Sequence, residues 1–254
     1  MRLPMLLLLM PLFWSVACSE EQIVTGVAAE SAFVRLLYGL THRDTLASQI
    51  AATELNAHLR SLRTVGYRPL ADADLDERMY RFDRAECAFL ESLASINGGE
   101  LDLAAVQLDQ AVYEVRAADP PVSAELYVLN LYDFIGAWLE VGTLYADRDA
   151  FVQEGRNCAA NALREWASIR YLRPDPVVYP SIARNPLPFL EAHLALESRL
   201  REVEGFVHRN DAIPEAVMRG TSEALWNVLL LFGGGETART TPKAGSNTVT
   251  PAAL

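Results

Sequence analysis

Four side chains in this sequence are the strongest candidates for holding a ligand or a metal ion. Asp133 and Glu140 are seven residues apart, so a helix places both on one face. Glu86 interrupts an apolar helical stripe, and His193 precedes Glu197 by four residues. Bundles that bind two metals use inward carboxylates supported by Glu-x-x-His motifs, which this sequence lacks. Solvated faces or buried hydrogen bonds are therefore the alternative explanation for the acids, and ordinary packing is the alternative for His193.

The other motifs in the sequence give weaker indications of a functional site. The run Asp72-Ala73-Asp74-Leu75-Asp76 resembles the start of a calcium loop, but Glu77 stands where that loop requires glycine. Asp74 and Glu77 have the spacing of a helix capping box, which explains the acids better. Neither Gly-x-Ser-x-Gly nor Cys-x-x-Cys-His occurs in the sequence. We therefore expect no catalytic residues, no metal and no cofactor.

Two of the three cysteines, Cys87 and Cys158, fall on predicted helices. In an oxidising compartment they form an even pair and are candidates for a disulfide bond. Two independent buried thiols are the alternative.

Composition excludes several classes of protein. Hydrophobic residues make up 51% of the 254, which is incompatible with disorder over most of the chain. The formal net charge is −11 and no basic patch is evident, so we expect no nucleic-acid partner. We likewise expect any contact with anionic lipid to depend on acyl chains and not on charge.

The N-terminus has the order of a secretory signal. Arg2 is followed by an uncharged apolar run over residues 3–14, and small residues lead to Cys18. The run is too short to span a bilayer, which takes roughly 20 residues. The sequence Ser15-Val16-Ala17-Cys18 resembles the lipobox of bacterial lipoproteins, although that family usually has leucine at the position of Ser15. The alternatives are ordinary cleavage before Cys18 and an uncleaved anchor.

The resemblance to lipoproteins implies a location in the cell. In that family the cysteine is acylated, with palmitate among the chains, and becomes the mature N-terminus, which fixes the protein to the membrane. Ser19 is not the aspartate that commonly signals retention at the inner membrane. The resemblance therefore implies the periplasmic face of the outer membrane, and a soluble periplasmic or secreted protein is the alternative.

Helical spacing dominates the rest of the chain, and no alternating strand pattern is evident. Asn97-Gly98-Gly99 predicts a helix end. The helix over 122–146 has apolar residues on most sides, which predicts a central position. Residues 173–188 hold five prolines, so we expect an extended path packed along the domain. About eight helices are expected, near residues 20–39, 44–63, 74–96, 101–117, 122–146, 148–172, 187–208 and 213–232.

These features predict an all-α fold. After a signal peptide over 1–17, a helical domain covers 18–232 and a disordered tail covers 233–254. The hairpin over 75–117 is similar in length and turn to a tetratricopeptide unit, but no period of 34 residues emerges. The helices are expected to form an antiparallel array, either an irregular set of hairpin repeats or a closed bundle.

Such an array indicates an interaction or scaffold module for a protein partner in the cell envelope. Tyr67, Tyr113, Tyr132 and Tyr179 lie off the main apolar stripes and are candidates for aromatic anchors. The alternative function is a periplasmic binding protein for a small apolar ligand or a metal, held near Glu86, Asp133, Glu140 and His193.

Overall fold

A computed structural model describes residues 10–65, 72–146 and 154–234. These residues form eleven helices and no strand, which confirms the all-α fold. The number exceeds the expected eight because two predicted segments contain additional short helices. One continuous apolar core runs through both the N-terminal and the C-terminal helices.

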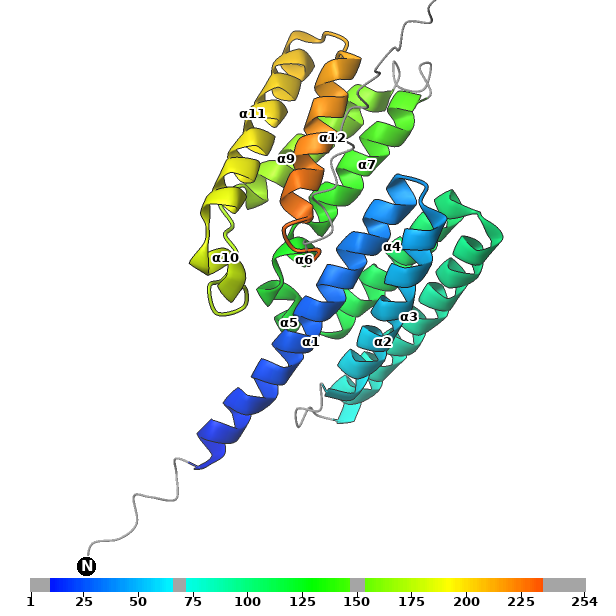
Figure 1. The fold of residues 1–254 in the computed structure, drawn as a ribbon, viewed down its shortest axis with the longest axis vertical. Helices are drawn as coiled ribbons and strands as arrows, with labels where there is room; N and C mark the ends of the chain where they lie inside the picture. Colours follow the sequence, from blue (N-terminus) through cyan, green and yellow to red (C-terminus); the bar gives the residue numbers. More distant parts are fainter. Residues whose placement is uncertain (1–9, 66–71, 147–153, 235–254) are drawn as a thin grey trace, which may run out of the picture.

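The first four helices pack as two antiparallel hairpins: α1 (Met10–Thr41) with α2 (Thr45–Val65), and α3 (Asp72–Gly98) with α4 (Leu101–Ala118). The hairpins lie side by side, and α1 also contacts α4 (Figure 1). These contacts close the four helices around a shared interior, as in a bundle and unlike an open superhelix.

Local sequence sets both hairpin turns. Between α1 and α2, Arg43 has a positive φ of 56°, and the Asp44 carboxylate accepts the N–H of Ala47 at 2.9 Å. The two helices approach closely at Gly39, where a Cβ would lie 2.7 Å from the Ser48 hydroxyl oxygen. Between α3 and α4, Gly99 has a φ of 79°, which confirms the predicted helix end.

The single helix predicted over 122–146 is wrong. The chain forms α5 (Pro120–Glu125), α6 (Tyr127–Asn130) and α7 (Tyr132–Ala146), with an extended residue, Leu126, between α5 and α6. The break has a polar cause: the N–H groups of Tyr127, Val128 and Leu129 donate to side chains from distant parts of the chain. Because they donate to side chains, these N–H groups do not take part in the backbone hydrogen bonds of a continuous helix.

The predicted central position of this region is confirmed. Phe134, Trp138 and Val141 of α7 are all at most 1% exposed. The indole N–H of Trp138 donates to the Ser222 hydroxyl on α12 (Glu215–Leu229) at 3.0 Å. Apolar packing and one partly buried hydrogen bond thus fix α7 among the C-terminal helices.

The remaining helices are α9 (Arg156–Ile169), α10 (Pro180–Arg184) and α11 (Leu187–Arg209). The predicted helix over 148–172 is shorter than expected at its C-terminal end, and residues 148–153 lie outside the described part. The proline-rich segment is only partly extended, because α10 forms within it. Pro180 and Pro188 sit in the first turns of α10 and α11, where a missing N–H costs nothing.

At the ends of the chain, α1 begins at Met10, about ten residues earlier than expected, and α12 ends at Leu229. Residues 1–9 of the predicted signal peptide and 235–254 of the predicted tail lie outside the described residues. Within the described part, Glu21–Thr41 is long and apolar enough to cross a membrane by length and composition alone. Of that window 56% is buried inside the protein, as in a core helix, and a signal sequence would pass the same test.

Candidate functional site

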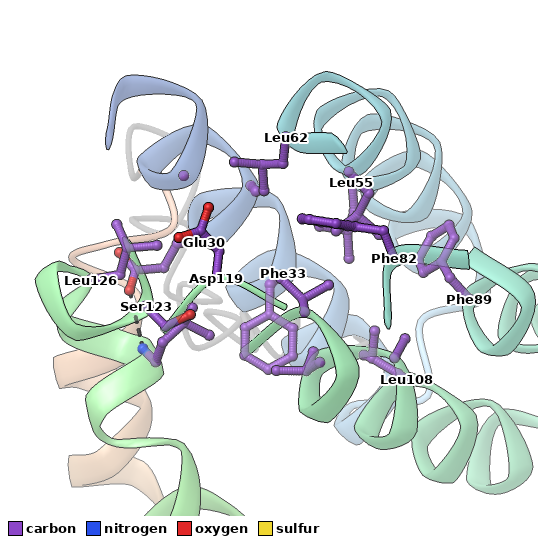
Figure 2. Close-up of a pocket in the computed structure, with 17 residues that line it drawn as sticks. Glu30, Phe33, Leu55, Leu62, Phe82, Phe89, Leu108, Asp119, Ser123 and Leu126 are labelled. Atoms are coloured by element: carbon purple, nitrogen blue, oxygen red, sulfur yellow. Dashed lines mark hydrogen bonds between the residues drawn. The ribbon is translucent and has the colours of Figure 1, made fainter. Parts of the chain in front are cut away.

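The structure contains an apolar cavity of about 50 Å³ between the two N-terminal hairpins. Most of its wall consists of aliphatic and aromatic side chains from the first four helices: Ala29, Phe33, Leu55, Leu59, Leu62, Phe82, Phe89, Leu108, Ala111, Val112 and Val115. Figure 2 shows Glu30, Asp119 and Ser123 gathered at one end beside Leu126, with Leu55, Phe82 and Phe89 at the other end. The cavity therefore has an apolar interior and a polar end.

Helical periodicity explains the apolar wall. Leu55, Leu59 and Leu62 recur at the spacing of one face of α2, so all three point inward. Facing them are the small side chains of Ala29 on α1 and Ala111 on α4. Small residues opposite large ones leave the space that forms the cavity.

The polar end is held by a buried arginine. Arg78 has a side chain only 5% exposed, and its guanidinium lies 3.4 Å from the Asp119 carboxylate. It also donates to the carbonyl of Leu62 at 3.1 Å and lies 4.7 Å from the centre of the Phe82 ring. Arg78 thus ties the end of α2 to the segment that follows α4, right beside the cavity.

Glu30 is a buried carboxylate in the middle of α1, 3% exposed. One oxygen accepts the N–H groups of Val128 at 2.6 Å and Leu129 at 3.2 Å. The other accepts the hydroxyl of Tyr179 at 2.5 Å. Burial raises the pKa of Glu30 to about 7, although all three hydrogen bonds oppose that shift.

Tyr179 completes this network. Its hydroxyl donates to Glu30 and accepts the N–H of Tyr127 at 2.7 Å. Burial raises the pKa of Tyr179 far above its ordinary value, and the negative charge of Glu30 adds to the effect. The phenol therefore stays protonated and keeps its donor hydrogen on Glu30.

Glu30, Tyr179, Arg78 and Asp119 are thus engaged with partners in the protein itself. Their geometry fixes α1, α5, α6 and the segment before α10 around the polar end of the cavity. The arrangement suits reversible binding of an apolar group, since the polar atoms brace the entrance and the apolar wall supplies the contact surface.

The four residues predicted to form a ligand or metal site are not brought together. Glu86 on α3 pairs with Arg63 at 3.0 Å, and Asp133 on α7 pairs with Arg116 at 2.8 Å. Glu140, also on α7, interacts with the thiol of Cys158. Among the residues that the structure describes, no three His, Cys, Asp or Glu side chains could hold a metal ion.

His193 is a packed side chain, 4% exposed on α11. Its ring lies 5.1 Å from the ring of Trp166 and 5.6 Å from that of Phe189, measured between centroids. Its Nε2 is buried and has no hydrogen-bond partner. Burial lowers the pKa of His193, with the positive charge of Arg173 contributing.

The candidate disulfide between Cys87 and Cys158 is not formed: both thiols are free. Cys87 is exposed on α3, and Cys158 is half-buried on α9. Burial and the nearby carboxylates of Glu140 and Glu154 raise the pKa of Cys158, so this thiol is a weak nucleophile.

Tyrosines predicted as interface anchors have different environments. Tyr113 is 55% exposed on the outer face of α4, whereas Tyr132 is half-buried and donates its hydroxyl to the carbonyl of Asp109. Tyr179 is 5% exposed, so it is a core residue and not a surface anchor. Tyr67 lies outside the described residues.

Sequence reasoning missed Glu30, the most deeply buried acid of this site. A signal was present, because Glu30 and Arg35 are the only charged residues between positions 22 and 40. A lone acid inside an apolar helix needs a partner when buried. Its partners lie about 100 and 149 positions further along the chain, which no local pattern reveals.

Compared with known proteins, the chain matches no protein-family model, no curated protein and no solved structure.

Proposed function

We propose that this chain is a non-catalytic binding protein of the cell envelope that takes the apolar end of a ligand into the cavity between α1, α2, α3 and α4. The cavity is the observation that carries the proposal. An apolar space is unfavourable for water, which needs two to four polar partners, but favourable for an alkyl group.

The size of the cavity limits the ligand. An engineered apolar cavity of about 150 Å³ accommodates benzene, so a space of about 50 Å³ suits a narrower group. The end of an alkyl chain has the right shape, with the remainder of the chain leaving past Asp119 and Ser123. The gain is roughly 0.8 kcal/mol for each methylene group that is buried.

The polar end favours a neutral head group. Glu30 and Asp119 both lie there, and only Asp119 has a cationic partner, Arg78. A ligand carboxylate at this end would meet two acids, whereas a hydroxyl group would meet no charge repulsion. We therefore expect alcohols and other uncharged amphiphiles to bind better than fatty acids of equal length.

Titration with straight-chain 1-alkanols from butanol to octanol tests this function. Methyl NMR signals of Leu55 and Leu108 should shift saturably, with affinity rising with chain length and then levelling off when the cavity is full. Octanoate should bind more weakly than octanol. Unchanged leucine signals at saturating alkanol would refute the proposal.

Filling the cavity with a larger side chain tests whether the alkanols bind there, and the same substitution on the outer face of α4 is the control. Ala111→Leu places a larger side chain in the wall, and we expect alkanol affinity to fall about tenfold or more. Ala117→Leu makes the same change on the exposed outer face of α4 and should leave affinity unchanged. Ala29→Val narrows the cavity from α1 and serves if Ala111→Leu fails to fold. Equal binding by all variants would mean that alkanols bind elsewhere.

Attachment to the envelope through an acylated Cys18 is part of the same proposal. It rests on the resemblance of residues 15–18 to a lipobox, with the periplasmic face of the outer membrane as the expected location. Mass spectrometry of protein purified from its own envelope tests it: a chain beginning at Cys18 and carrying acyl groups is the expected result. An unmodified chain would refute lipidation while leaving the cavity experiment unaffected.

A protein partner is the second candidate function. It is supported by exposed apolar residues along the outer face of α4, namely Leu103, Val106 and Tyr113, which are 46%, 67% and 55% exposed. A photo-crosslinking residue at Val106 should capture one defined partner in intact cells, and one at exposed Asp211 should not. No position-specific product would count against the scaffold function.

A further inference from the structure

The arginines between positions 156 and 184 differ from the other arginines that the structure describes. Among arginines whose side chains the structure describes, those before residue 120 and after residue 190 all pair with a carboxylate within 4.0 Å. Five arginines that lie between these two regions form no such pair within the described residues: Arg156, Arg164, Arg170, Arg173 and Arg184. The last three belong to one stretch of the chain. Arg173 and Arg184 donate to backbone carbonyls. Arg170 lies against the ring of Tyr171 with its Nε buried, and its positive charge contributes to the lowered pKa of Glu197.

These three arginines stand in a locally basic segment of an acidic protein. Asp175 is the only acid between positions 170 and 187, so three arginines against one aspartate give this stretch a net charge of +2. The carboxylate of Asp175 is also occupied, since it accepts the N–H groups of Val177 and Val178. The whole chain, in contrast, carries −11.

Exposed apolar side chains lie among the arginines. Tyr171 is 74% exposed, Val177 86% and Leu187 58%. The guanidinium of Arg170 lies 4.7 Å from the centre of the Tyr171 ring. We call the surface formed by Arg170, Tyr171, Arg173, Val177, Arg184 and Leu187 the arginine rim.

The apolar part continues along α11. Leu190 and Leu194 are exposed on the face of α11 opposite Phe189 and Leu196, which are buried in the core. Helix α11 is therefore apolar on two sides in its first two turns, and the outer side has no partner among the described residues.

The arginine rim lies near the N-terminal attachment point. Tyr179, in the same segment, is bonded to Glu30 of α1. Glu30 is 12 residues from Cys18 along a continuous helix, which corresponds to roughly 18 Å. In Figure 1, α10 lies at the lower end of the C-terminal helices, and the N-terminal part of α1 extends toward the same end of the molecule.

We propose that the arginine rim rests on a membrane surface that contains anionic phospholipid. The arginines would contact lipid phosphates, and Tyr171, Val177 and Leu187 would enter the headgroup region, where tyrosine is commonly found. The proposal rests on the envelope attachment proposed above, and it departs from the expectation that only acyl chains mediate contact with anionic lipid. Charge complementarity selects a lipid surface over an apolar protein face.

Vesicle flotation tests the proposal separately from lipidation and from ligand binding. The protein for this test begins at residue 18 and carries Cys18→Ser, so neither the leader nor an acyl chain contributes. Every described side-chain hydrogen bond and ion pair comes from residues 21–234, so this chain keeps all of them. We expect binding to vesicles of phosphatidylglycerol and phosphatidylethanolamine, weakening at high salt, and no binding to phosphatidylcholine vesicles.

Two triple variants locate the contact. Replacing Arg170, Arg173 and Arg184 by glutamine should weaken vesicle binding roughly 100-fold. Replacing Arg199, Arg201 and Arg219 by glutamine removes the same charge from exposed positions on α11 and α12, and should change binding less than about threefold. The double variant Tyr171→Ser with Val177→Ser keeps all charges and should still bind more weakly than the parent.

Two results would overturn the proposal. Equal losses in both triple variants would show that net charge, and not the arginine rim, governs binding. Absence of binding to anionic vesicles, together with concentration-dependent self-association that Tyr171→Ser and Val177→Ser abolish, would assign the surface to a second copy of the chain.

Discussion

Tyr179 donates its hydroxyl hydrogen to Glu30 at 2.5 Å, across 149 positions of the sequence. The same hydroxyl accepts the N–H of Tyr127, and the other Glu30 oxygen accepts those of Val128 and Leu129. One buried acid and one buried phenol thereby join α1, α6 and the proline-rich segment. This junction explains why the helix expected over 122–146 is interrupted, and it leads to the first two predictions.

Tyr179→Phe should lower the free energy of unfolding by about 1–3 kcal/mol. The substitution keeps the ring packed but leaves a Glu30 oxygen and the N–H of Tyr127 buried without a partner. Urea denaturation at neutral pH measures the loss. Tyr171→Phe, at an exposed position, is the matched control and should change stability by less than about 0.5 kcal/mol. Equal effects would mean that water replaces the Tyr179 hydroxyl.

Glu30 should make stability depend on pH in a defined direction. Its pKa is about 7 in the folded protein against an ordinary 4.5, so the folded state binds this proton more tightly than the unfolded state. The contribution is fully present below about pH 4.5 and is lost as pH rises through about 7. The complete loss corresponds to about 3 kcal/mol.

Comparison with Glu30→Gln isolates this effect. The amide does not titrate, so the stability of the parent relative to the variant should fall between pH 4.5 and pH 8. Other titrating groups, including His193, are common to both proteins and cancel in the difference. A constant difference over that range would show that Glu30 stays ionised and that its three hydrogen bonds outweigh its burial.

His193→Leu should stabilise the protein by about 1 kcal/mol. The substitution removes a buried nitrogen that has no partner and retains an apolar side chain between Trp166 and Phe189. The gain should be larger in acid. Because burial lowers the pKa of His193, its contribution to stability is present above the ordinary pKa and is lost as pH falls through the lowered value.

Thermal denaturation at pH 5 and pH 8 tests this prediction. His208→Leu, at an exposed position in the last turn of α11, is the control and should show no comparable stabilisation. A loss of stability in His193→Leu at both pH values would indicate that the imidazole has a partner, such as a bound water molecule, that the apolar side chain cannot replace.

The outcomes for particular residues show which parts of this fold are readable from sequence. Gly99 and the leucines of α2 act through neighbours within a few positions, so periodicity and turn chemistry found them. Glu30 and Arg78 act on groups that only folding brings near, and local patterns could not assign their partners. Glu86, Asp133, Glu140 and His193 are not brought together for the same reason, since all four have nearer partners or apolar packing.

Glu114 tests how much one buried acid at the interface between α3 and α4 contributes to the free energy of unfolding. Its side chain is 1% exposed and accepts hydrogen bonds from Arg81 at 3.0 Å and Gln110 at 2.9 Å. It also forms an ion pair with Arg84 at 2.9 Å. Glu114→Gln keeps the shape but loses the charge, so we expect a loss of about 1–3 kcal/mol in the free energy of unfolding.

The matched control is Glu202→Gln, which breaks a pair with Arg199 whose members are 44% and 47% exposed. That pair is hydrated in both states, and its loss should cost less than about 0.5 kcal/mol. Added salt should reduce the stability loss of Glu114→Gln only slightly, because buried groups are poorly screened. If both substitutions cost equally little, the arginines beside Glu114 must turn into water and the amide must find replacement partners within the interface.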